Sequence, residues 1–73
     1  MKIVILGNKN ARYALILRKL DRNTKISVDN TITYYYSNHL DVLKQLAKDL
    51  KEVEAESLFL DINIYDYNEC HYV

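Results

Sequence analysis

The sequence predicts a single small α+β domain in which helices cover one face of a four-stranded, mainly antiparallel sheet. Three features carry this prediction: an apolar run near the start of the chain, alternation of apolar and polar residues in two later segments, and one segment with apolar residues at helical spacing. The chain has 73 residues, one glycine and no proline, and no stretch of it has the composition of a linker. We therefore expect residues 1–73 to fold as one unit.

The first predicted element is a strand over residues 3–6. This run reads Ile-Val-Ile-Leu and is followed by Gly7 and Asn8, two residues that favour turns. Because no polar residue interrupts the run, we expect a strand that is buried on both faces and central in the sheet.

Residues 11–22 fit two patterns. Four apolar residues follow the helical spacing i, i+3, i+4, i+7: Tyr13, Ile16, Leu17 and Leu20. Tyr13, Leu15 and Leu17 also alternate, as in a strand. We favour the helix, because Asn10 can cap its first turn and basic residues near its end complement the helix dipole. If the segment is instead a strand, residues 7–10 form a hairpin loop.

The segment from Thr24 to Tyr36 alternates except at Asn30, which interrupts the apolar face and predicts two short strands joined by a hairpin at residues 29–31. Five apolar residues share one face, which we assign to the core: Ile26, Val28, Ile32, Tyr34 and Tyr36. Tyr35 then points to the opposite face, which the helices leave open.

A helix is predicted over residues 39–54. Asn38 and Asp41 have the spacing of a capping box. The apolar stripe of this helix consists of Leu43, Leu46, Ala47, Leu50 and Val53.

A last strand is predicted over residues 58–65. Its core face is aliphatic, and its other face carries Phe59, Asp61, Asn63 and Tyr65. The elements together give the order β-α-β-β-α-β, which is the ferredoxin-like order. The alternative is a meander, β-β-β-β-α-β, with the single long helix over residues 39–54.

The charges of the chain are balanced in total but separated along the sequence. From Met1 to Lys25, seven basic residues accompany one acid, and from Ile26 to Val73, three lysines accompany nine acids. The single cysteine argues for a reducing compartment, and no apolar run is long enough to cross a membrane. We expect a cytoplasmic protein.

Catalytic and cofactor-binding patterns are absent from the sequence. Gly7 stands alone, so no glycine-rich phosphate loop exists. Cys70 and His71 are adjacent, which places their side chains on opposite sides of a strand and disfavours a shared metal ion. We expect no enzymatic activity, no cofactor and no metal.

Seven tyrosines are the most distinctive feature of the composition. Tyrosine has a rigid apolar ring and a polar tip, which suits binding surfaces. We expect a protein-interaction module, a small regulator or inhibitor that occupies a partner's surface, and phage-encoded anti-CRISPR proteins are one example of this class. The expected contact residues are Tyr35, Phe59, Asp61, Tyr65, Tyr67, Glu52, Glu54 and Glu56. The three glutamates could imitate phosphates toward a nucleic-acid-binding partner.

The alternative function is binding of single-stranded nucleic acid through the open sheet face and the basic segment 12–25. Its candidate residues are Arg12, Arg18, Lys19, Arg22 and Lys25. Against it, residues 31–36 lack the basic residue and glycine of the RNP1 motif, and Asp61 would repel phosphate. Homodimerisation through the open sheet is compatible with either function.

Overall fold

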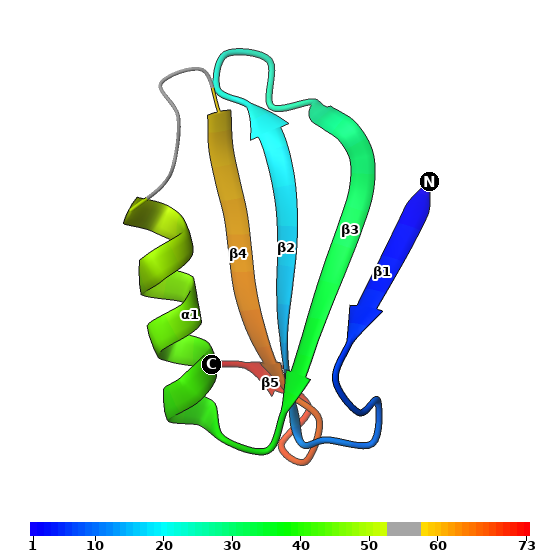
Figure 1. The fold of residues 1–73 in the computed structure, drawn as a ribbon, viewed down its shortest axis with the longest axis vertical. Coiled ribbons are helices and arrows are strands. Elements are labelled where there is room, and N and C mark those ends of the chain that lie inside the picture. Colours follow the sequence, from blue (N-terminus) through cyan, green and yellow to red (C-terminus); the bar gives the residue numbers. More distant parts are fainter. Residues whose placement is uncertain (53–57) are drawn as a thin grey trace.

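A computed structural model describes residues 1–52 and 58–73 and contains one helix and a mixed sheet of five strands in that part of the chain (Figure 1). The elements are β1 (Lys2–Leu6), β2 (Tyr13–Asp21), β3 (Ser27–Ser37), α1 (Leu40–Glu52), β4 (Leu58–Asp66) and β5 (His71–Tyr72). The strand order is β1-β3-β2-β4-β5, with β1 parallel to β3 and every other pair antiparallel. The predicted α+β class is confirmed, whereas the four-stranded ferredoxin-like order is not.

Strand β2 occupies the middle of the sheet, so the helix predicted over residues 11–22 is wrong. It pairs with β3 on one side and with β4 on the other, and Leu15 lies opposite both Tyr35 and Ile64. Ala14 and Leu15 are fully buried. The apolar residues of this segment fit a helix and a strand alike, and a central strand buries both of its faces, which one surface helix cannot do.

Strand β1 lies at the edge of the sheet, where a central position was predicted. The predicted hairpin loop at residues 7–10 is also wrong, because β1 pairs with β3 and the chain passes the end of β3 to reach β2. Gly7 allows this close passage. Its φ is +87°, and a Cβ atom at this position would lie 2.5 Å from the carbonyl oxygen of Tyr36.

Strand β3 is one strand with an irregularity, so the hairpin predicted at residues 29–31 is wrong. The order of the predicted meander is wrong as well, because three strands and not four precede the helix. Asn30 has a φ of +55°, and its N–H donates to Oγ of Ser27 at 3.0 Å. The register with β2 shifts at this point. Short polar side chains satisfy the backbone of this bulge locally, and the strand then continues.

The register of β3 also reverses the predicted faces of its tyrosines. Leu15 lies opposite Tyr35, and Tyr35 packs against the core beneath α1. Tyr34 and Tyr36 therefore point to the other face of the sheet. Both faces of β3 contain apolar or aromatic residues, so the aliphatic faces of β2 and β4 decide which of them meets the helix.

The helix predicted over residues 39–54 is confirmed by α1, and its residues from 53 onward lie outside the described part of the chain. The buried core joins the helix to the sheet and consists of Leu15, Leu17, Leu43, Leu60 and Ile64. The predicted capping box is absent at Asn38, whose side-chain oxygen accepts a hydrogen bond from the N–H of Arg12 at 2.8 Å. This bond attaches the start of the helix to the start of β2.

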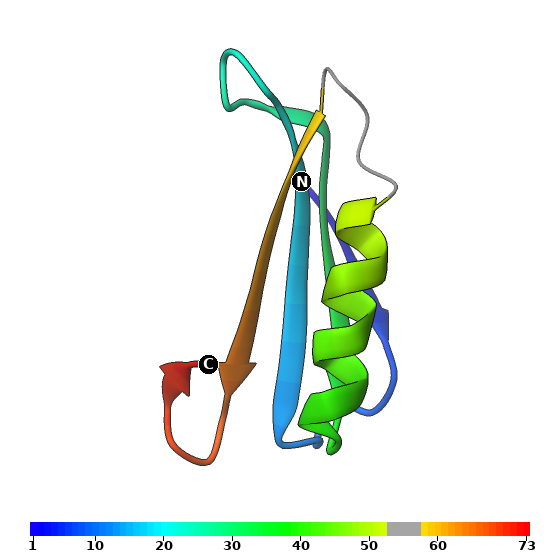
Figure 2. The same ribbon diagram turned by 90° about the vertical axis from the view of Figure 1, so that its left-hand side faces the viewer.

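The molecule has two layers, as the edge-on view shows, with α1 on one side of the sheet (Figure 2). The helix contacts β2, β3 and β4 but not β1. Between β3 and β4 the chain crosses over through α1, and β2 lies between these two strands. Within the described ranges, no helix has the length and apolar character needed to cross a membrane.

Candidate functional site

The face of the sheet opposite α1, called the open face below, receives side chains from all five strands. Strand pairing places the following residues on it: Ile3, Ile5, Ala14, Ile16, Arg18, Leu20, Ile32, Tyr34, Tyr36, Phe59, Asp61, Asn63, Tyr65 and Tyr72. The alternation of β4 predicted this face correctly for Phe59, Asp61, Asn63 and Tyr65. No other element of the described chain covers it.

Five tyrosines form a continuous series of ring contacts at one end of the open face, and we call them the tyrosine cluster: Tyr34, Tyr36, Tyr65, Tyr67 and Tyr72. The rings of Tyr34 and Tyr36 stack with centroids 6.0 Å apart, and Tyr36 stacks on Tyr67 at 6.2 Å. Tyr65 meets Tyr67 edge to face at 4.9 Å and Tyr72 at 5.1 Å. Both geometries are favourable for aromatic pairs, so each ring holds its neighbour in place.

A small residue makes room for this cluster. Ala14 lies between Tyr36 and Tyr65 in the register of the three central strands, and it is fully buried. Because its side chain is a single methyl group, the larger tyrosine rings on either side can close over the middle strand. Four of the five rings of the cluster are thus carried by strands of the sheet.

Asp66 fixes the turn that brings Tyr67 into the cluster. Asp66 is buried, with 4% of the residue exposed, and its carboxylate accepts hydrogen bonds from Nε and Nη2 of Arg12 at 3.1 and 2.9 Å. The carboxylate also accepts hydrogen bonds from the backbone N–H groups of Asn68 and Glu69. The hydrogen bonds from Arg12, together with those from Glu69 and Asn68, outweigh burial and lower the pKa of Asp66 to about 2.

The Tyr67 hydroxyl is held in its neutral form. Desolvation by the surrounding rings, and then a hydrogen bond with Tyr36, raise the pKa of Tyr67 to about 12. The backbone N–H of Tyr67 donates to the carbonyl of Arg12 at 2.8 Å, which attaches the turn to the start of β2. Ring and backbone of Tyr67 are therefore both fixed.

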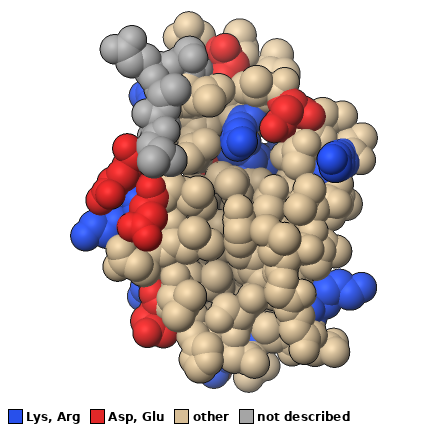
Figure 3. Space-filling model, in the orientation of Figure 1, with Lys and Arg blue, Asp and Glu red and all other residues tan. Residues whose placement is uncertain are grey.

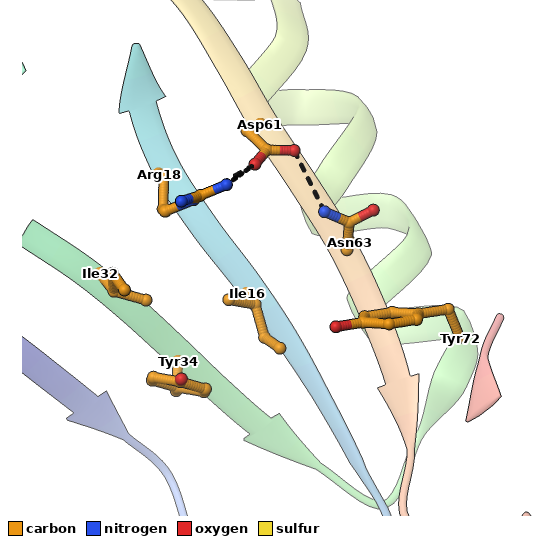
Figure 4. A pocket seen from close by; sticks show the side chains of 7 residues that line it. All are labelled: Ile16, Arg18, Ile32, Tyr34, Asp61, Asn63 and Tyr72. Atoms are coloured by element: carbon orange, nitrogen blue, oxygen red, sulfur yellow. Dashed lines mark hydrogen bonds and ion pairs between the residues drawn. The ribbon is translucent and has the colours of Figure 1, made fainter. Parts of the chain in front are cut away.

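A shallow depression of about 200 Å³ lies beside the cluster (Figure 4). Ile16 and Ile32 supply its aliphatic part, and Tyr34 and Tyr72 stand at its margin. Its polar end is formed by Arg18, whose Nη2 donates to Oδ2 of Asp61 at 2.7 Å, and by Asn63, which donates to the other Asp61 oxygen at 3.1 Å. The following residues line the depression: Ile16, Arg18, Ile32, Tyr34, Asp61, Asn63 and Tyr72.

At the other end of the open face, Phe59 is paired with a cation. The Nζ of Lys25 lies 4.4 Å from the centroid of the Phe59 ring. Lys25 has a φ of +61° and belongs to the loop between β2 and β3, where Asp21 accepts the backbone N–H groups of Asn23 and Thr24. The loop thus places this lysine over the ring.

Four of the eight predicted contact residues come together on the open face or at its margin: Phe59, Asp61, Tyr65 and Tyr67. Tyr35 lies on the covered face against the core. Glu52 lies on α1, on the other side of the sheet, and Glu54 and Glu56 fall outside the described residues. Of the four predicted acidic contacts, Asp61 therefore shares a surface with the tyrosines and Glu52 does not.

The predicted basic segment does not form one surface either. Arg12 binds the buried Asp66, Arg18 pairs with Asp61, and Lys25 covers Phe59. Lys19 points to the side of the helix, because neighbouring strand residues alternate. Arg22 donates to the carbonyl of Leu58 at 2.9 Å. Folding thus pairs two arginines of the basic half, Arg12 and Arg18, with two aspartates of the acidic half, Asp66 and Asp61.

The view from the helix side shows the same mixing of charge. Acidic and basic side chains both occur along α1, whereas the central part of the molecule in this view is uncharged (Figure 3). Among the residues the structure describes, no three His, Cys, Asp or Glu side chains gather into a possible metal site.

Sequence reasoning missed Tyr34, Tyr36 and Tyr72 as members of the site, together with the isoleucines beside them. Two of these tyrosines were assigned to the core because they alternate with Ile32 on an apolar face. The unusual run Tyr34-Tyr35-Tyr36 was the available signal, since three consecutive tyrosines in a strand must place rings on both faces.

No protein-family model, curated protein or solved structure matches this chain.

Proposed function

We propose that this protein is a non-enzymatic protein-binding module that docks on its partner through the open face. The observation that carries the proposal is the tyrosine cluster, five rings in mutual contact on a side of the sheet that no other described element covers. Burial of such an aromatic face on binding removes apolar surface from water. The loss of side-chain entropy on binding is small, because the rings already hold one another in place.

The composition of the open face favours a protein partner. Fully buried centres of protein interfaces are enriched in tyrosine and depleted of charge. Of the strand residues on this face, Arg18 and Asp61 are the charged ones, and they neutralise each other at 2.7 Å. The complementary surface is therefore apolar, with hydrogen-bonding groups for the tyrosine hydroxyls and without a strong net charge.

Docking through the open face changes the role of the acidic residues. Glu52 lies on α1, across the sheet from the tyrosine cluster, so one flat partner surface cannot contact both. We therefore assign binding to the tyrosines and not to imitation of phosphates. A small module that covers a partner's surface blocks whatever else that surface binds, which is how an inhibitor of the anti-CRISPR kind would act.

Stacking of bases on the tyrosine cluster is the competing function. Base stacking on aromatic side chains needs cations along the backbone of the nucleic acid. Arg18 and Lys25, the cations nearest to the open face, are engaged with Asp61 and Phe59. This arrangement favours protein over nucleic acid.

A photo-crosslinking amino acid at position 72 tests the proposal. Tyr72 is 63% exposed at the rim of the cluster, and Val42, which is 54% exposed on α1, provides a matched position on the other side. We expect the probe at position 72 to give a discrete crosslinked protein in cells and the probe at position 42 to give none. The crosslink should disappear when Tyr34→Ser is added and persist when Lys44→Ser is added on α1.

Titration with single-stranded oligonucleotides separates the two functions. The proposal predicts no binding at low salt. Binding that weakens with added salt and strengthens in Asp61→Asn, which removes a negative charge from the face, would establish the nucleic-acid function instead.

A further inference from the structure

Strand β1 has the composition of a central strand and the position of an edge strand. Ile3, Ile5 and Leu6 are 57%, 46% and 45% exposed. Such continuous apolar runs are typical of strands that are buried on both faces. The central strands differ from β1, because Leu15 and Leu17 of β2 and Leu60 and Ile64 of β4 lie in the buried core.

The outer edge of β1 lacks the usual protection against pairing. In the described chain β1 is hydrogen-bonded only to β3, and α1 does not contact it. Exposed edges are normally blunted by charges, proline, a bulge or a covering element. β1 has one charged residue, Lys2, at its first position, and neither proline nor a bulge. Its backbone is available to another strand.

We infer that β1 pairs edge to edge with β1 of a second copy of this chain, antiparallel, with Val4 opposite Val4 at the two-fold axis. A two-fold axis perpendicular to the sheet keeps like faces on the same side, which requires that residues opposite each other share a face. The register centred on Val4 satisfies this condition and is the one that pairs all five residues of β1.

This register suits the side chains. It places Ile3 opposite Ile5 of the second copy, twice, on the open face, and cross-strand pairs of β-branched residues stabilise a sheet. Lys2 falls opposite Leu6, so the two lysines lie at opposite ends of the paired strands, about 14 Å apart. A strand from another protein with charged side chains would have only Lys2 of β1 as a possible ion-pair partner. A second copy of β1 instead places apolar residues opposite the apolar residues of the first.

Pairing of this kind gives β1 the central position that its sequence predicts. β1 becomes an inner strand of a sheet that continues through both copies, and its edge is satisfied. The inference is independent of the proposed function, because it uses the edge of the sheet and not the tyrosine cluster.

A charge at the two-fold axis tests the inference. Val4→Lys places two like charges directly opposite each other, and the sedimentation coefficient should fall from that of a dimer to that of a monomer. The matched control is Val42→Lys, the same substitution at an exposed position on α1, and this variant should remain dimeric. Circular dichroism at the same concentration establishes that both variants keep their fold.

Charge reversal makes the test specific for the register. Val4→Glu alone should also be monomeric, and mixing it with Val4→Lys should restore a mixed dimer, because lysine then lies opposite glutamate. A wild-type chain that sediments as a monomer up to high micromolar concentration would overturn the inference. A dimer that Val4→Lys leaves intact would overturn it as well.

Crosslinking gives a second, independent readout. In a Cys70→Ser background, Val4→Cys places two cysteines with Cα atoms about 4.5–5.5 Å apart, within disulfide range. Mild oxidation should convert this variant to a covalent dimer, whereas Lys2→Cys should stay monomeric under denaturing conditions because its sulfurs are far apart. Equal crosslinking of both variants would show random collision and contradict the register. None of these substitutions alters the open face, so a failed dimer and a failed docking function remain distinguishable.

Discussion

The two faces of the sheet bury their aromatic residues in different ways. On the covered face Tyr13 and Tyr35 pack against leucines of the core and the helix. On the open face the tyrosines pack against one another and leave their outer surfaces to solvent. The same residue type thus stabilises the fold on one side and forms a presentable surface on the other.

The comparison teaches that neighbours, and not the strand's own pattern, select the covered face. β3 offers Thr31, Thr33 and Tyr35 on one side and Ile32, Tyr34 and Tyr36 on the other. The second side is more apolar, yet the first side meets the helix, because Leu15 and Leu17 of the adjoining strand point that way. The more apolar side of β3 is thus left on the open face, through which we propose that the protein binds its partner.

The largest expected effect is a difference in stability between alanine variants of two adjacent residues of β2. Leu15→Ala removes a fully buried side chain and should lower the free energy of unfolding by about 2–5 kcal/mol, enough to unfold much of a domain this small. Ile16→Ala, on the open face, should cost about 1–2 kcal/mol, because the isoleucine is already partly in water. Urea denaturation measures both. Equal losses would mean that the open face is as buried as the core.

Acid should weaken the attachment of the β4–β5 turn. The pKa of Asp66 lies at about 2, below its ordinary value of 3.8, because Arg12 and two backbone N–H groups stabilise the carboxylate. Its contribution to stability is complete above pH 3.8 and is lost as the pH falls toward 2. Asp66→Asn should therefore be less stable at neutral pH and show a shallower acid loss in thermal unfolding. An unchanged acid limb in Asp66→Asn would contradict the assignment.

Alkali should act on the tyrosine cluster. The pKa of Tyr67 is raised from 10.0 to about 12, so the folded state keeps a proton that the unfolded chain has lost in that interval. Stability contributed by this hydroxyl is complete below pH 10 and disappears as the pH rises to about 12. Absorbance titration of tyrosinate should show a late step that is missing in Tyr67→Phe. If the late step persists in this variant, it belongs to another tyrosine.

The smallest expected effect concerns the ion pair on the open face. Arg18 and Asp61 remain 47% and 26% exposed in their side chains, so water screens their attraction. A double-mutant cycle with Arg18→Ala and Asp61→Ala should give a coupling energy of about 0.2–1 kcal/mol. A coupling above this range would mean that the pair is shielded from water, as it would be inside an interface.

Helix α1 and the face of β4 were predictable from the sequence because each has one uniformly aliphatic side. The helical stripe around Leu43 has no competing period, and the even-numbered residues from Leu58 to Ile64 are all aliphatic. In these two elements one side is uniformly aliphatic, so local pattern and tertiary packing give the same answer.

The remaining elements depend on contacts that a local pattern does not contain. In β2 the helical and strand periods fall on the same residues, and partners on both sides decide between them. The apolar run of β1 predicts a buried strand but does not indicate which other strand pairs with it. The tyrosine cluster likewise depends on the ion pair of Arg12 with Asp66, which are 54 positions apart. The predicted site therefore included Tyr65 and Tyr67 but missed Tyr34, Tyr36 and Tyr72.

Hydroxyl-radical footprinting of the free chain and of the chain bound to its crosslinked partner tests the central proposal most directly. We predict strong oxidation of Tyr34 and Tyr72 in the free chain and protection of both in the complex, with the exposed surface of α1 around Val42 modified equally in the two states. Protection that falls on α1 while the tyrosine cluster stays reactive would show that the partner binds elsewhere and would contradict the proposed docking face.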